Sequence, residues 1–99
     1  MSLPISCSLT DFELQERRRD VLQKARRAVV DVRELENGYA YSFSAADECL
    51  TELAQLINLE RQCCPFLRFC ITVLPDNGAI WLEMTGPEGA KEFLAATFA

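Results

Sequence analysis

The sequence predicts an α+β fold, a two-layer sandwich in which one four-stranded, mostly antiparallel sheet lies against helices. Two hairpin signals support it, because Asn37-Gly38 and Asp76-Asn77-Gly78 each separate two runs of alternating apolar residues. Helix-forming residues follow the second run in both places. The pairs Asn37-Gly38 and Asn77-Gly78 lie 40 residues apart. The sheet is therefore expected to be built from two β-hairpin-plus-helix repeats.

An additional N-terminal helix is expected over residues 10–28, after a flexible lead at 1–9. Thr10 and Glu13 have the spacing of a capping box, in which each side chain bonds the backbone N–H of the other. The helix carries one thin apolar stripe, made by Leu14, Val21, Leu22, Ala25 and Val29. At 99 residues the chain is expected to form a single domain, 1–99.

The first repeat is expected over residues 28–64, with strands at about 28–35 and 39–44. Ser44 to Asp47 reads as a second capping box, and a helix is expected from about 46 to 63. Pro65 should end this helix, because the residue before a proline is disfavoured in the α conformation.

The second repeat is expected over residues 66–99, with a strand at 67–74, a strand through Ile80 and Met84, and a helix opened by Gly86-Pro87. Alternation places one row of side chains toward the helices: Tyr39, Tyr41, Phe43, Leu67, Phe69, Ile71, Val73, Ile80, Leu82 and Met84. The other sheet face is mixed and includes Trp81 and Cys70. Either the N-terminal helix or a second copy of the chain is expected to cover it.

The charge distribution excludes some classes of partner. The net charge is −5, and residues 34–99 hold three Lys and Arg against ten Asp and Glu, which disfavours nucleic-acid binding. The basic residues of the first helix are interpreted as a solvated helix face. No apolar run approaches the ~20 residues of a membrane span, and no signal peptide is recognisable, so a cytoplasmic location without membrane contact is expected.

Five cysteines and no histidine define the available chemistry. An odd number of cysteines in a chain without an export signal favours reduced thiols, and the absence of histidine removes the commonest general base and zinc ligand. Cys49 and Cys70 are interpreted as structural. Cys63 and Cys64 are different, because two adjacent cysteines at the end of a helix are not required for packing.

Glu60 lies in the apolar stripe of the same helix, four residues before Cys64. A carboxylate there must be paired or hydrogen-bonded. Its partner is expected to be Arg68 or an arginine of the first helix, or else Glu60 and the thiols form one site.

A nucleophilic cysteine is disfavoured, because the C-terminal end of a helix and Glu60 both oppose a thiolate, with Arg61 and Arg68 offsetting only part of this. A bound soft cation would deprotonate the thiols instead. We therefore predict binding or sensing of a thiophilic metal or metalloid, such as copper(I), mercury(II) or arsenic(III), that is not required for folding. Cys7, Cys63 and Cys64 are the predicted ligands, with Glu60, Arg61 and Arg68 around them.

Two alternatives remain. The chain is a small homodimer or adaptor that uses the sheet face of Trp81 and Cys70, with inert cysteines. The less favoured alternative is a thiol redox or transfer enzyme that uses Cys63 or Cys64.

Three strings, "CSLT" at 7–10, "LERQCCPFLRF" at 59–69 and "WLEMTGPEGAKEFL" at 81–94, resemble a family of small, mostly uncharacterised bacterial proteins with an E-R-x-C-C-P-F motif. Such proteins are loosely associated with heavy-metal resistance genes. The resemblance covers nearly the whole chain and implies Cys7, Glu60, Cys63 and Cys64 as the residues of interest. It implies no established activity.

Overall fold

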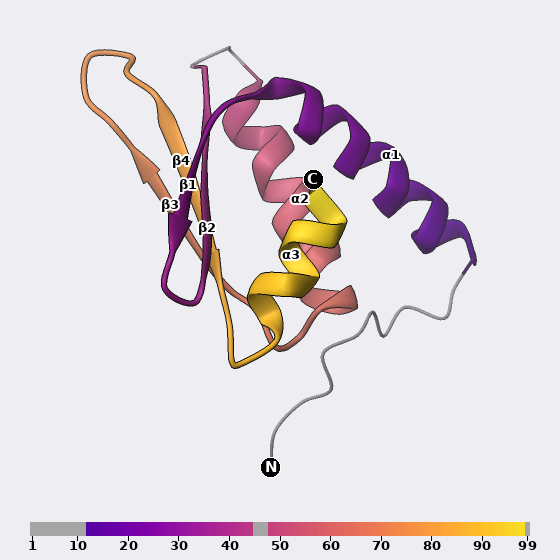
Figure 1. The fold of residues 1–99 in the computed structure, drawn as a ribbon. Helices are drawn as coiled ribbons and strands as arrows, with labels where there is room; N and C mark the ends of the chain where they lie inside the picture. The colour runs from indigo at the N-terminus through magenta and orange to yellow at the C-terminus, as the bar shows by residue number, and fades with distance from the viewer. Residues whose placement is uncertain (1–11, 45–47, 99) are drawn as a thin grey trace.

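The computed structural model describes residues 12–44 and 48–98, which form one four-stranded sheet and three helices (Figure 1). The elements follow in the order α1 (Phe12–Ala28), β1 (Val29–Leu35), β2 (Gly38–Phe43), α2 (Cys49–Cys63), β3 (Arg68–Val73), β4 (Ile80–Thr85) and α3 (Ala90–Phe98). The strand order is β1-β2-β4-β3 and every pairing is antiparallel. The predicted α+β fold is confirmed.

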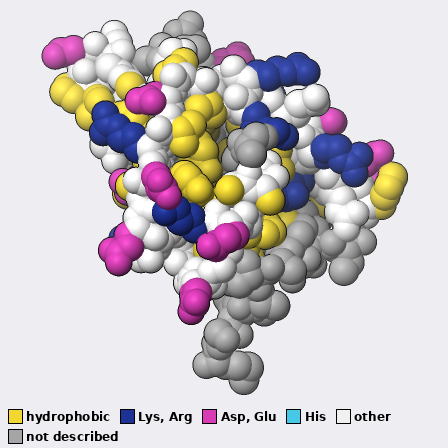
Figure 2. Space-filling view, viewed as in Figure 1, with side chains coloured by type: hydrophobic (Ala, Val, Ile, Leu, Met, Phe, Trp, Pro, Cys, Tyr) yellow, Lys and Arg dark blue, Asp and Glu magenta, His cyan; other side chains and the backbone are white. Residues whose placement is uncertain are grey.

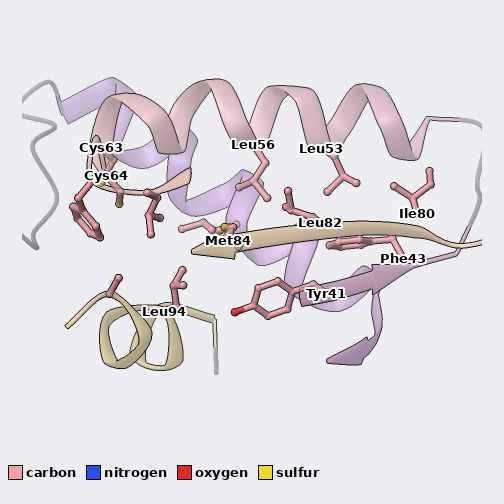
Figure 3. Packing of buried hydrophobic residues seen from close by; sticks show 14 of the residues in the cluster. Tyr41, Phe43, Leu53, Leu56, Cys63, Cys64, Ile80, Leu82, Met84 and Leu94 are labelled. Carbon is pink, nitrogen blue, oxygen red and sulfur yellow. The ribbon is translucent and has the colours of Figure 1, made fainter. Parts of the chain in front are cut away.

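The side chains that face the helices form rows across the sheet. Tyr41 pairs with Leu82, and Leu82 with Ile71. The flanking rows also consist of apolar and aromatic residues. They are Tyr39, Met84 and Phe69 on one side, and Phe43, Ile80 and Val73 on the other. Leu82 and Met84 are almost completely buried, and Leu53, Leu56 and Leu94 pack over these rows from α2 and α3 (Figure 3). The strand alternation in the sequence therefore placed the core on the correct face.

The two Asn-Gly pairs occupy different places in their hairpins. The first turn has two residues, Glu36 and Asn37, because Leu35 already pairs with Gly38. Gly38 must remain glycine, since a Cβ there would lie 1.9 Å from the carbonyl oxygen of Met84 in the neighbouring strand. In the second hairpin Asn77 and Gly78 lie inside a six-residue loop, 74–79, between Val73 and Ile80.

Helix α1 lies on α2, on the side away from the sheet (Figure 1). It packs there because its apolar stripe supplies Leu22 to the core, with Val21 and Ala25 against it. It does not cover the outer sheet face, so that alternative for Trp81 is wrong. The Trp81 side chain is half-buried, with the guanidinium of Arg33 4.5 Å from the ring centroid.

Several predicted boundaries moved. Helix α3 begins at Ala90 rather than at Gly86-Pro87, because Pro87 to Ala90 first make a turn in which the Ala90 N–H bonds the Pro87 carbonyl. Helix α2 begins at Cys49, with Glu48 as N-cap and no side-chain cap bond. Ser44, the first residue of the predicted second capping box, is not the N-cap, and its predicted partner Asp47 and the predicted cap Thr10 lie outside the described residues.

Candidate functional site

The cysteine pair lies where α2 ends. Cys63 is the last residue of the helix, and Cys64 is its C-cap with φ −123° and ψ 70°, outside the α region as expected before Pro65. The Leu67 N–H then bonds the Cys64 carbonyl at 3.1 Å and closes a turn. Phe66 in this turn packs edge-to-face on Phe93 of α3, with the ring centroids 5.2 Å apart. Both cysteines are thereby fixed at one end of the core (Figure 3).

Glu60 points inward from the preceding turn of α2 and is completely buried. Its carboxylate is held by Arg18 of α1 through two bonds, from Nε to Oε1 at 2.6 Å and from Nη2 to Oε2 at 3.3 Å. A two-point arginine–carboxylate contact is the arrangement best able to offset the cost of burying a carboxylate. Of the partners that the sequence left open for Glu60, the structure selects an arginine of the first helix.

The Cys64 thiol completes this cluster, since its Sγ donates to Glu60 Oε2 at 3.7 Å. Burial, followed by the charge of Glu60, raises the pKa of Cys64 to about 12, while Arg18 opposes the shift. The buried cluster is therefore neutral at pH 7: one guanidinium, one carboxylate and one protonated thiol. A thiol in this state is a poor nucleophile.

Cys63 is also completely buried, and it is disulfide-bonded, whereas Cys49, Cys64 and Cys70 are free thiols. The expectation of reduced thiols thus fails at Cys63. That expectation was based on the odd number of cysteines, and this number does not show which sulfur atoms the fold brings together. Because Cys64 is free, the bond is not the strained one between adjacent cysteines.

The remaining predicted site residues are placed as follows. Arg61 and Arg68 are both exposed, and neither makes any of the ion pairs found in the described part of the chain. Cys70 is exposed on β3, whereas Cys7 lies outside the described residues. Among residues 12–44 and 48–98, no three His, Cys, Asp or Glu side chains are grouped closely enough to hold a metal ion.

Arg18 is the residue of this cluster that the sequence did not single out. It follows Leu14 by four residues and precedes Leu22 by four, so it lies within the apolar stripe of α1 as Glu60 lies within that of α2. An arginine in one stripe and a glutamate in the other form the signal that would have identified the pair.

Comparison with family models, with curated proteins and with solved structures gave no match for this chain. No helix in the described part of the chain has the length and apolarity to cross a membrane.

Proposed function

We propose that this protein captures a thiophilic metal or metalloid ion through Cys63 and Cys64 once the disulfide of Cys63 has been reduced. The observation that carries the proposal is the contact between the Cys64 thiol and the buried Glu60 carboxylate beside a second sulfur. A soft ion replaces thiol protons, and a carboxylate already bonded to one of those thiols is positioned to accept one.

The charge of the cluster favours a divalent ion. Glu60 and Arg18 cancel, and both thiols are neutral when protonated. Replacing two protons by one divalent cation leaves the buried cluster neutral, whereas a monovalent ion on two thiolates leaves one uncompensated negative charge in the core. Mercury(II) is the natural probe, since two thiolates suffice for it. Cys7, the predicted third sulfur, would add the ligand that arsenic(III) needs.

Reduction comes first in this scheme. A dithiol reduces the disulfide of Cys63 by supplying two electrons and two protons, and is itself oxidised to a disulfide. A phosphine supplies only the two electrons and becomes a phosphine oxide, while water supplies the oxygen and the two protons. The ion then binds Cys63 and Cys64 and two protons leave, one of them by way of Glu60. Because Cys63 and Cys64 are both buried, the turn at 64–67 must open for the ion to enter.

The test is a titration of mercury(II), and separately of arsenite, into protein that has been reduced with a phosphine and then freed of it, since a phosphine is itself a soft ligand. Binding only to the native state raises the melting temperature. We expect a rise for the reduced wild type, and none for the oxidised wild type or for Cys63→Ser/Cys64→Ser. Cys49→Ser/Cys70→Ser is the matched control and should respond as the wild type does.

An equal response of the reduced wild type and Cys63→Ser/Cys64→Ser would refute the proposal. Cys7→Ser measures the contribution of the third predicted sulfur. Peptide mapping of a non-reduced digest identifies the partner of Cys63 and shows whether that variant also removes the disulfide.

A further inference from the structure

The two edge strands of the sheet present different edges to solvent. Strand β1 carries three charged residues, Asp31, Arg33 and Glu34, and its register shifts between Val29 and Asp31. The Asp31 carboxylate also accepts the Val32 N–H at 2.9 Å. Charges, an irregular register and a blocked N–H are devices that keep an edge strand from pairing with another chain.

Beyond its first residue, Arg68, strand β3 has none of these devices. After Arg68 its sequence is Phe-Cys-Ile-Thr-Val, with no charge and no proline, and its pairing with β4 is regular over all six residues. Val73 and the following Leu74 are large apolar residues with 56% and 41% of their surfaces exposed. The β3–β4 hairpin projects from the molecule at the upper left of Figure 1, and Figure 2 shows hydrophobic side chains gathered on it. An open, regular and apolar edge favours pairing with another strand.

The backbone groups that β3 offers can be assigned from its register. The Leu74 N–H bonds the Ala79 carbonyl at 3.2 Å, so this pair is hydrogen-bonded toward β4. Bonded and non-bonded pairs alternate along an antiparallel ladder. Cys70 and Thr72 therefore bond toward β4, and the three residues whose N–H and C=O groups face the open edge are Phe69, Ile71 and Val73.

We propose that β3 pairs antiparallel with β3 of a second copy of this chain, centred on Ile71, so that one sheet runs through both copies. This register is self-complementary. Ile71 lies opposite the partner's Ile71, and Phe69 opposite the partner's Val73, so residues with outward-facing backbone groups meet and an apolar row continues across the joint. Cys70 lies opposite the partner's Thr72.

Charge complementarity identifies a second copy as the occupant. Arg68 begins β3, and Asp76 lies just beyond its other end; both are exposed. Two-fold symmetry brings Arg68 of each copy to the end of the joint where β3 of the other copy leads into the turn that carries Asp76, so opposite charges lie near each other at both ends of the joint. This interface differs from the predicted one at Trp81, which lies on β4, and it does not depend on the proposed ion binding.

Sedimentation over a wide range of protein concentration tests the proposal. The wild type should reach twice the 11.2 kDa chain mass, and Val73→Lys should shift the dimer to monomer, because it places a lysine in the apolar row of the joint. Val32→Lys is the matched control. It replaces an exposed valine on β1, at the opposite edge of the sheet, and should leave the dimer unchanged. A monomeric wild type, or equal loss of dimer in both variants, would overturn the proposal.

Cross-linking tests the register. Cys70 and the partner's position 72 form a non-hydrogen-bonded pair, for which Cα atoms about 4.5 Å apart fall within the range of a disulfide. Under mild oxidation Thr72→Cys should give a covalent dimer, whereas the wild type and Cys70→Ser/Thr72→Cys should not. A covalent dimer of wild type through Cys70 alone would place Cys70 at the centre and refute the Ile71-centred register.

Discussion

Two ion pairs join α1 to α2, and they lie in opposite environments. Lys24 and Glu52 meet at 2.7 Å near the start of α2, with 67% and 36% of their side chains exposed. Arg18 and Glu60 meet at 2.6 Å near its end, where the values are 17% and 0%. Water can solvate the first pair if it separates, whereas Glu60 has no access to water. Separating Lys24 from Glu52 therefore costs little free energy, whereas separating Arg18 from Glu60 leaves a buried carboxylate without a partner.

A buried thiol lies near each pair. Cys49 lines a groove of about 50 Å³ together with Lys24 and Glu52, and burial followed by the charge of Glu52 raises its pKa. Cys64 and Arg18 both bond the carboxylate of Glu60, and the pKa of Cys64 is raised more strongly than that of Cys49, to about 12. A helix N-terminus favours a thiolate, but at Cys49 burial and Glu52 outweigh it. Only at Cys64 does the thiol also bond the carboxylate.

The largest effect is expected from Arg18→Met, which keeps the apolar stem of the side chain and removes its charge. Glu60 is then buried without a partner, and the free energy of unfolding should fall by about 3–5 kcal/mol. Urea denaturation at pH 7, with the disulfide intact, measures the loss. Arg18→Met/Glu60→Leu should recover most of it, since no unpaired charge remains. If the double variant is no more stable than Arg18→Met, the loss reflects packing of the arginine stem rather than the stranded carboxylate.

The next effect is a pH dependence that belongs to Cys64. The pKa of an unfolded cysteine is about 8.5, and the pKa of folded Cys64 is about 12, so between these values the native state holds a proton that the unfolded state has lost. The contribution of Cys64 to stability is complete below the unfolded pKa and falls by about 1.4 kcal/mol per pH unit above it.

Wild type should therefore lose stability faster than Cys64→Ala between pH 9 and 11, by roughly 2–3 kcal/mol in total. The difference between their urea denaturation curves isolates Cys64 from the other groups that titrate in this range. Cys49→Ala serves as the comparison at the other end of α2, because its thiol is buried without a bond to a carboxylate. Parallel curves for wild type and Cys64→Ala would show that Cys64 is not held protonated by the fold.

This contrast between the ends of α2 also marks what the sequence was able to predict. Alternation and helical periodicity identified the core rows and the inward position of Glu60, because burial repeats with the period of each element. Periodicity within one helix does not show which residue of another helix lies opposite. The pairing of Glu60 with Arg18 and the disulfide of Cys63 depend on tertiary contacts, so the periodicity of the sequence could not predict them.

The smallest effect is expected from Lys24→Met. Its ion pair with Glu52 is solvated on both sides, and the hydrogen bond and charge of Glu52 raise the pKa of Lys24. An exposed pair contributes little to stability and is screened by salt, so the change in unfolding free energy should be small at low ionic strength and vanish at high salt. The loss from Arg18→Met should persist in salt, because the solvent ions that screen Lys24 do not reach a buried carboxylate. Equal losses for Lys24→Met and Arg18→Met, with equal salt dependence, would show that burial does not distinguish the two ends of the helix.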